Sequence, residues 1–111
     1  MSDKDILWLD SDFLQSVWGE SEGNTERFNR VMDALAEEYD LRITQTVVAE
    51  STSDLNYPKD ADIQDWLDSS GITPVSTSLD NVSGGDAGER SIIEAMEQAL
   101  LADPDSTHRV A

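Results

Sequence analysis

Cysteine is absent from the 111-residue chain, and histidine occurs once, as His108. These absences exclude a disulfide scaffold, a thiolate zinc site and a histidine cluster for zinc. No run of 18 apolar residues is present, so no transmembrane helix is predicted. The first residues, MSDKDILWLD, are acidic and carry no signal-peptide pattern. We expect a protein of a reducing compartment, with a cytoplasmic location.

Positive charge is also scarce. Seven basic residues, only two of them Lys, face 24 acidic ones, which gives a formal net charge of −17. Such a surface repels phosphate backbones and argues against a free-standing nucleic-acid binder. A salt-adapted source, a basic partner or mimicry of nucleic acid would each explain the excess of acids. A metal site would account for only a few of them.

Motifs for nucleotide binding or nucleophilic catalysis are missing. There is no GxGxxG pattern, and GGDAG at 84–88 lacks the Lys of a phosphate-binding loop. His108 lies too close to the end of the sequence to suggest a Ser-His-Asp arrangement. Arg27, Arg30 and Arg42 are too few to form a track for nucleic acid.

The first half of the chain alternates strand and helix patterns. The apolar run Ile6–Leu9 predicts a buried strand, parallel and central in its sheet. A short helix follows to Gly19, and a longer one, capped by Asn24 or Thr25, runs to about Tyr39. The β-branched segment 43–48 predicts either a strand or a turn that leads into a helix carrying Glu50.

The second half has the same character. Asp60 or Asp62 is expected to cap a helix that Gly71 ends, and residues 72–79 predict an edge or irregular strand containing Pro74. The most regular helix runs from about Asp86 to Ala102. Its expected buried stripe consists of Ile92, Ile93, Met96, Ala99 and Leu100.

The last residues, HRVA, predict a third strand. Strands that alternate with helices indicate an α/β fold, with a short parallel sheet flanked by helices. The length suits one domain, residues 1–111. Because the sequence stops inside an apparent strand, we expect that domain to be cut short at its C-terminus.

Five acids are candidates for a site. Open α/β sheets bind ligands at the carboxyl ends of their strands, where Asp10 follows the first strand. Asp10 either holds Mg²⁺ or Mn²⁺, or it or its neighbour Ser11 caps the next helix. Glu50 follows the apolar stretch TQTVVA and either faces the same cleft or lies on a solvated surface. Asp54 is a weaker candidate nearby.

Asp86 and Glu89 stand three residues apart at the start of the last helix. This spacing fits a capping box, with Asp86 as cap, and both charges suit the positive end of the helix dipole. A metal site needs more than this, because acids from separate elements must then converge on one point.

Three segments together resemble the PIN-domain ribonucleases, the family of the VapC toxins. The segments are ILWLDSDFL, TVVAES and DAGERSIIEAMEQAL, which place acids near residues 10, 50 and 90. The resemblance covers about residues 6–102 and implies a PIN-like three-layer sandwich. It also implies an endoribonuclease that hydrolyses phosphodiesters with carboxylate-bound Mg²⁺ or Mn²⁺.

Within that resemblance the metal ligands and catalytic acids are Asp10, Glu50 and Glu89, with Asp86 as a substitute or supporting acid. The implied partners are an RNA substrate, a cognate antitoxin or other basic protein, and a second copy in a homodimer. The family carries a further acid after the third strand, which this chain lacks, so the fragment is expected to cut slowly or not at all. A different function stays open, namely a non-enzymatic acidic module, antitoxin-like or immunity-like, that binds a basic protein. A plain α/β domain without a site of its own is the third reading.

Overall fold

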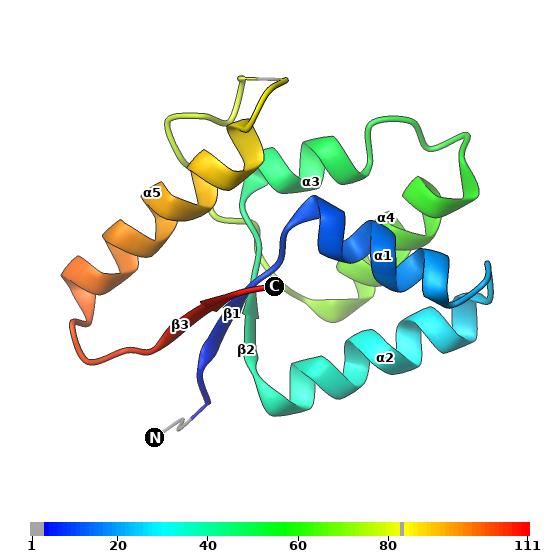
Figure 1. The fold of residues 1–111 in the computed structure, drawn as a ribbon, viewed down its shortest axis with the longest axis horizontal. Helices are drawn as coiled ribbons and strands as arrows, with labels where there is room; N and C mark the ends of the chain where they lie inside the picture. Colours follow the sequence, from blue (N-terminus) through cyan, green and yellow to red (C-terminus); the bar gives the residue numbers. More distant parts are fainter. Residues whose placement is uncertain (1–3, 83) are drawn as a thin grey trace.

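Three short strands form a parallel sheet in the order β2-β1-β3. The computed structural model describes residues 4–82 and 84–111. Five helices surround the sheet (Figure 1). In chain order the elements are β1 (Ile6–Trp8), α1 (Ser11–Glu20), α2 (Thr25–Glu38), β2 (Asp40–Arg42), α3 (Gln45–Ser51), α4 (Pro58–Ser70), α5 (Ala87–Ala102) and β3 (His108–Val110).

Strand β1 occupies the centre of the sheet. Its first residue, Ile6, pairs with Asp40 of β2 on one side and with His108 of β3 on the other. All three of its residues are buried, because an apolar strand in a parallel sheet is covered on both faces. The predictions of a central parallel first strand and of a third strand at the end of the chain are therefore confirmed.

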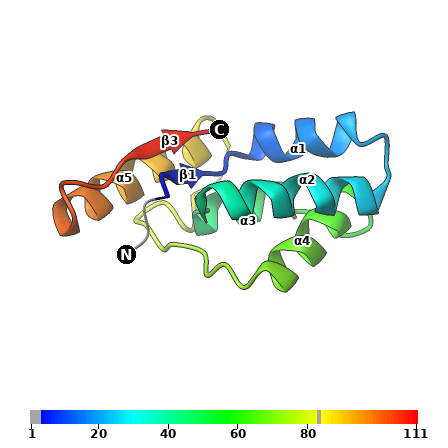
Figure 2. The ribbon, with the colours of Figure 1, turned by 90° about the horizontal axis from the view of Figure 1, so that it is seen from below.

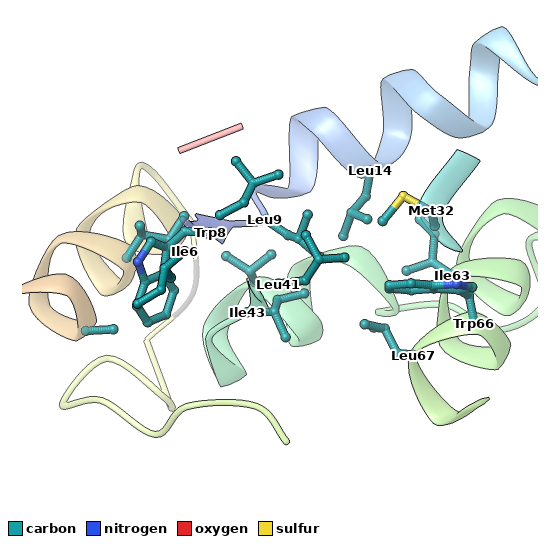
Figure 3. Packing of buried hydrophobic residues seen from close by; sticks show 14 of the residues in the cluster. Ile6, Trp8, Leu9, Leu14, Met32, Leu41, Ile43, Ile63, Trp66 and Leu67 are labelled. Atoms are coloured by element: carbon teal, nitrogen blue, oxygen red, sulfur yellow. The ribbon is translucent and has the colours of Figure 1, made fainter. Parts of the chain in front are cut away.

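The helices cover the two faces of the sheet unequally, so that the fold has three layers. Helices α1, α2 and α4 lie on one side and α5 on the other (Figures 1 and 2). In Figure 3, Ile6 and Trp8 lie beside α5, whereas Leu14, Met32 and Ile63 pack on the opposite side. Side chains of a strand alternate between its two faces, and this alternation lets one three-residue strand serve both layers.

The segment after β2 takes the helical alternative. The strand is at Asp40–Arg42, earlier than the β-branched residues, and helix α3 begins at Gln45. The side chain of Thr44 caps α3 by accepting a hydrogen bond from the Val47 N–H (3.2 Å). Glu50 is therefore a helical residue.

The strand predicted at 72–79 is wrong. This segment makes one isolated bridge, in which the Val75 N–H donates to the Ile43 carbonyl and the Gln45 N–H donates to that of Val75 (2.8 and 2.9 Å). Pro74 has no N–H to extend the ladder. After Val75, backbone N–H groups of the segment donate to side chains and not to a neighbouring strand. The Thr77 N–H donates to Asp80 and the Ser78 N–H to Glu94 of α5 (2.8 and 2.6 Å).

Helix α4 is not capped as predicted. It begins at Pro58, where proline's fixed φ suits a first helical position, and neither Asp60 nor Asp62 caps it. Buried Asp60 instead accepts a hydrogen bond from the Asp54 N–H, and Asp62 accepts one from the Trp18 indole (3.0 and 2.9 Å). The predicted end at Gly71 is confirmed, because this glycine has a left-handed φ of 77°.

The predicted stripe of α5 is right in part. Ile92 is buried, and Met96 and Ala99 pack partly against the core. Ile93 and Leu100 are 65% and 38% exposed, so placing them in the core was wrong. The helix buries one narrow face, formed by Gly88, Ser91, Ile92 and Ala95 at positions i, i+3, i+4 and i+7, and Ile93 lies about 100° away from Ile92. In the described part of the chain no helix is both long and apolar enough to span a membrane.

Candidate functional site

Asp10 lies just beyond the carboxyl end of the central strand. It is the N-cap of α1, and its Oδ1 accepts a hydrogen bond from the Ser11 N–H (2.8 Å), so the capping prediction is confirmed. Its other oxygen, Oδ2, accepts no hydrogen bond from residues 4–82 or 84–111. Capping therefore uses one oxygen and leaves the second for a ligand.

Glu50 reaches the same place from α3. Its Oε2 accepts a hydrogen bond from the Ser11 hydroxyl (3.2 Å), and its side chain is half-buried. Ser11 itself is only 8% exposed. One buried serine thus joins two carboxylates, because its N–H holds Asp10 and its hydroxyl holds Glu50.

Gly88, in the first turn of α5, lies against the carboxylate of Glu50. A Cβ at this position would lie 2.8 and 2.9 Å from the two carboxylate oxygens of Glu50, closer than real contacts allow. The glycine therefore lets the Glu50 carboxylate approach the start of α5.

Asp86 and Glu89 are exposed and less engaged. Asp86 is the N-cap of α5, but its side chain makes no capping hydrogen bond, so the predicted capping box is wrong. Its ψ of 28° is not the extended backbone from which a cap side chain reaches the next turn, and Gly84 and Gly85 before it both have positive φ. Glu89 is the residue after Gly88, and its side chain is exposed.

Asp10, Ser11, Glu50 and Gly88 thus come together, whereas Glu89 is joined to them only as the exposed neighbour of Gly88 in sequence. In residues 4–82 and 84–111 no three acids or histidines are close enough to hold a metal ion as they stand. Mg²⁺, however, keeps several waters and is commonly bound through one or two carboxylates together with substrate phosphates. Asp10 and Glu50, both hydrogen-bonded to Ser11, are two carboxylates of the kind that such a site uses.

Ser11 and Gly88 were not predicted as parts of the site. The only sequence signals were the serine directly after the acid at the strand end and the glycine inside a helical start. Asp54, the weaker candidate, is not part of the cluster. Its carboxylate accepts a hydrogen bond from the Asn56 N–H (3.0 Å) in a local turn.

Comparison with known proteins adds no relative. No family model, no curated protein and no solved structure matches the chain.

Proposed function

We propose that the chain is a Mg²⁺- or Mn²⁺-dependent endoribonuclease of the PIN-like type. Asp10 and Glu50 are the metal carboxylates, and Glu89 is the third acid. The supporting observation is the cluster of Asp10, Ser11, Glu50 and Gly88 at the carboxyl end of the central parallel strand. This edge is where open α/β sheets bind their ligands.

Each residue of the cluster has a task. Ser11 orients Glu50 through its hydroxyl and Asp10 through its N–H, so that both acids are held before a substrate arrives. Gly88 has no side chain and so leaves room for the Glu50 carboxylate beside the start of α5. A bound divalent cation would activate water for attack on a phosphodiester and neutralise charge on the phosphate.

The acidic surface affects how RNA reaches this site. With a net charge of −17, the protein repels a phosphate backbone everywhere except where a cation intervenes. RNA binding is therefore expected to depend on the divalent cation itself and not on a basic track.

Manganese titration tests the site directly. Paramagnetic Mn²⁺ broadens the signals of nearby amides, so in ¹⁵N–¹H spectra we expect the first losses around residues 10–12, 50 and 88–90. Asp10→Asn and Glu50→Gln should weaken this broadening by about tenfold each, since each removes one charged ligand. Asp65→Asn, an exposed acid on α4, is the matched control and should leave it unchanged.

Cleavage of a fluorogenic single-stranded RNA in Mg²⁺ tests the reaction. Glu50→Gln should abolish the activity while its circular dichroism spectrum stays that of the native chain. The site assignment fails if broadening spreads evenly over the acidic surface, or if the Asp10 and Glu50 variants bind Mn²⁺ as the native chain does. Metal binding without any cleavage would overturn the nuclease while leaving the metal site standing.

A further inference from the structure

An apolar groove runs along the solvent-facing side of α5, away from the acid cluster. Ile93, Met96, Leu100, Leu101 and Pro104 line it, and its volume is about 580 Å³. Leu101 is 77% exposed and Ile93 65%. Large apolar side chains gathered on one exposed face indicate an interaction surface. We call these five residues the α5 stripe.

The α5 stripe has the spacing of a helix that packs against another helix. Counted from Ile93, its members are at positions i, i+3, i+7, i+8 and i+11. These positions repeat on one side of a helix, with the loop residue Pro104 extending the row beyond Ala102. An amphipathic helix recognises such a groove through apolar residues at i, i+3 or i+4, and i+7.

The polar residues in and beside the groove are acidic. Glu97 lines it midway between Ile93 and Leu101, is exposed and forms no ion pair with any described residue. Asp103 and Asp105 are exposed at its far end. The one basic residue of α5, Arg90, precedes the stripe. A partner on this surface therefore meets negative charge both within the groove and at its end.

That charge argues against a second copy of the chain as the occupant. A two-fold pairing of the stripe about its midpoint would place Glu97 against Glu97 of the other copy. Each copy would also bring a net charge of −17 to the interface. Like charges that face each other across an interface cost binding free energy, whereas a cationic partner gains from the same groups.

We propose that the α5 stripe binds an amphipathic, cationic helix of a partner protein. The apolar face of that helix fills the groove, and a Lys or Arg side chain pairs with Glu97. This surface is distinct from the proposed nuclease site, because it begins at Ile93 on the outer face of α5, whereas Gly88 and Glu89 are in the first turn of the helix.

A synthetic helical peptide is the probe, with Leu at i, i+3 and i+7 and Lys or Arg at its other positions. Amide shifts in ¹⁵N–¹H spectra should concentrate on residues 93–105. The double variant Ile93→Ser with Leu101→Ser should weaken binding by about tenfold or more, because a few buried anchors carry most of the affinity of such interfaces. Glu97→Lys should weaken it comparably. All three positions are exposed, so native circular dichroism spectra are expected.

Matched controls separate the groove from general charge attraction. Leu55→Ser removes an apolar side chain that is 57% exposed elsewhere, and Glu22→Lys reverses an exposed acid after α1. Neither should change the affinity more than about twofold, since neither touches the groove. Glu50→Gln should bind the peptide normally, so a failed metal site and a failed groove give different results.

Three results would overturn the proposal. Shifts scattered over the acidic surface, with Glu22→Lys as damaging as Glu97→Lys, would show unspecific attraction. Equal binding of a peptide with Glu in place of Lys and Arg would remove the role of charge. Sedimentation equilibrium that shows a dimer, broken by Leu101→Ser, would assign the stripe to a second copy.

Discussion

Adding a single methyl group at Gly88 would disturb the position of the Glu50 carboxylate. In Gly88→Ala the new Cβ would lie 2.8 Å from a Glu50 oxygen. Because that oxygen is the far end of a flexible side chain, we expect Glu50 to swing away and lose its hydrogen bond to Ser11, which costs about 1 kcal/mol. Alanine in a helix returns about 0.5–1 kcal/mol. The free energy of unfolding should therefore stay near the native value, while Mn²⁺ affinity falls.

Gly19 is the matched glycine for this experiment. It also lies in a helix, but a Cβ there would meet no atom within 4 Å. Gly19→Ala should therefore show the full helix gain of about 0.5–1 kcal/mol in urea unfolding and leave Mn²⁺ binding unchanged. If Gly88→Ala is stabilised as much as Gly19→Ala and binds Mn²⁺ normally, Glu50 has no fixed place in a metal site.

At the residue scale, the sequence indicated the acids better than their surroundings. Asp10 and Glu50 could be chosen because each follows an apolar stretch, and the structure joins them. Ser11 and Gly88 could not be chosen, because their roles depend on tertiary contacts. The Ser11 N–H bonds Asp10 and its hydroxyl bonds Glu50, and Gly88 makes room for Glu50 of another helix. The capping box of Asp86 failed because the preceding glycines set a backbone geometry that residue spacing does not reveal.

The pairing of β1 with β3 carries its own pH dependence. The Trp8 indole N–H donates to Nδ1 of His108 (2.9 Å), so the ring proton is on Nε2, which faces the Ser106 hydroxyl at 2.8 Å. Burial, with Arg42 nearby, lowers the pKa of His108 below 6.5, against the opposing effect of Asp103 and Asp40. Protonation of Nδ1 would remove the acceptor of the indole and weaken the link between the two strands.

The sign of the effect follows from this lowered pKa. Between the unfolded value of 6.5 and the lower folded value, the unfolded chain binds more protons, so stability is lost as pH falls through that window. His108→Asn keeps an acceptor oxygen in the place of Nδ1 but does not titrate. Urea unfolding at about pH 5 and about pH 7.5 should show a larger loss for the native chain than for the variant. Equal losses would mean that His108 does not titrate in this window.

At the element scale, periodicity predicted helices well and strands less well. Strand β1 was found because its apolar run is buried on both faces. The segment 72–79 has strand-forming residues, yet Pro74 and the Ser and Thr side chains give its backbone other partners. The α5 stripe was partly misassigned because residue pattern alone does not show which of two adjoining apolar faces meets the core. The two residues wrongly placed in the core, Ile93 and Leu100, line the groove for which we propose a partner.

The whole molecule carries many more acids than bases, 24 against seven. Three ion pairs among the described residues engage Asp40, Asp60 and Asp5, whereas the sequence has 24 acids. Such an excess destabilises the compact state through self-repulsion. Repulsion between exposed charges is long-ranged at low salt, so its removal by salt should stabilise the native chain.

Thermal unfolding in NaCl tests this balance. From about 10 mM to about 150 mM salt the screening length falls from about 30 Å to about 8 Å. We expect a gain of at least about 1 kcal/mol, which corresponds to a rise in Tm of about 4–8 °C in a domain of this size. Glu37→Lys, an exposed substitution on α2, should raise Tm at low salt and reduce the further gain in Tm on adding salt.

Over the same range of salt, binding of the cationic peptide to the α5 stripe should weaken, because screening acts on attraction as it does on repulsion. A Tm that is constant over this range would show that the negative charges are too far apart to govern stability. If Tm and the affinity for the peptide instead changed in the same direction with salt, charge would not govern both folding and peptide binding in the way proposed.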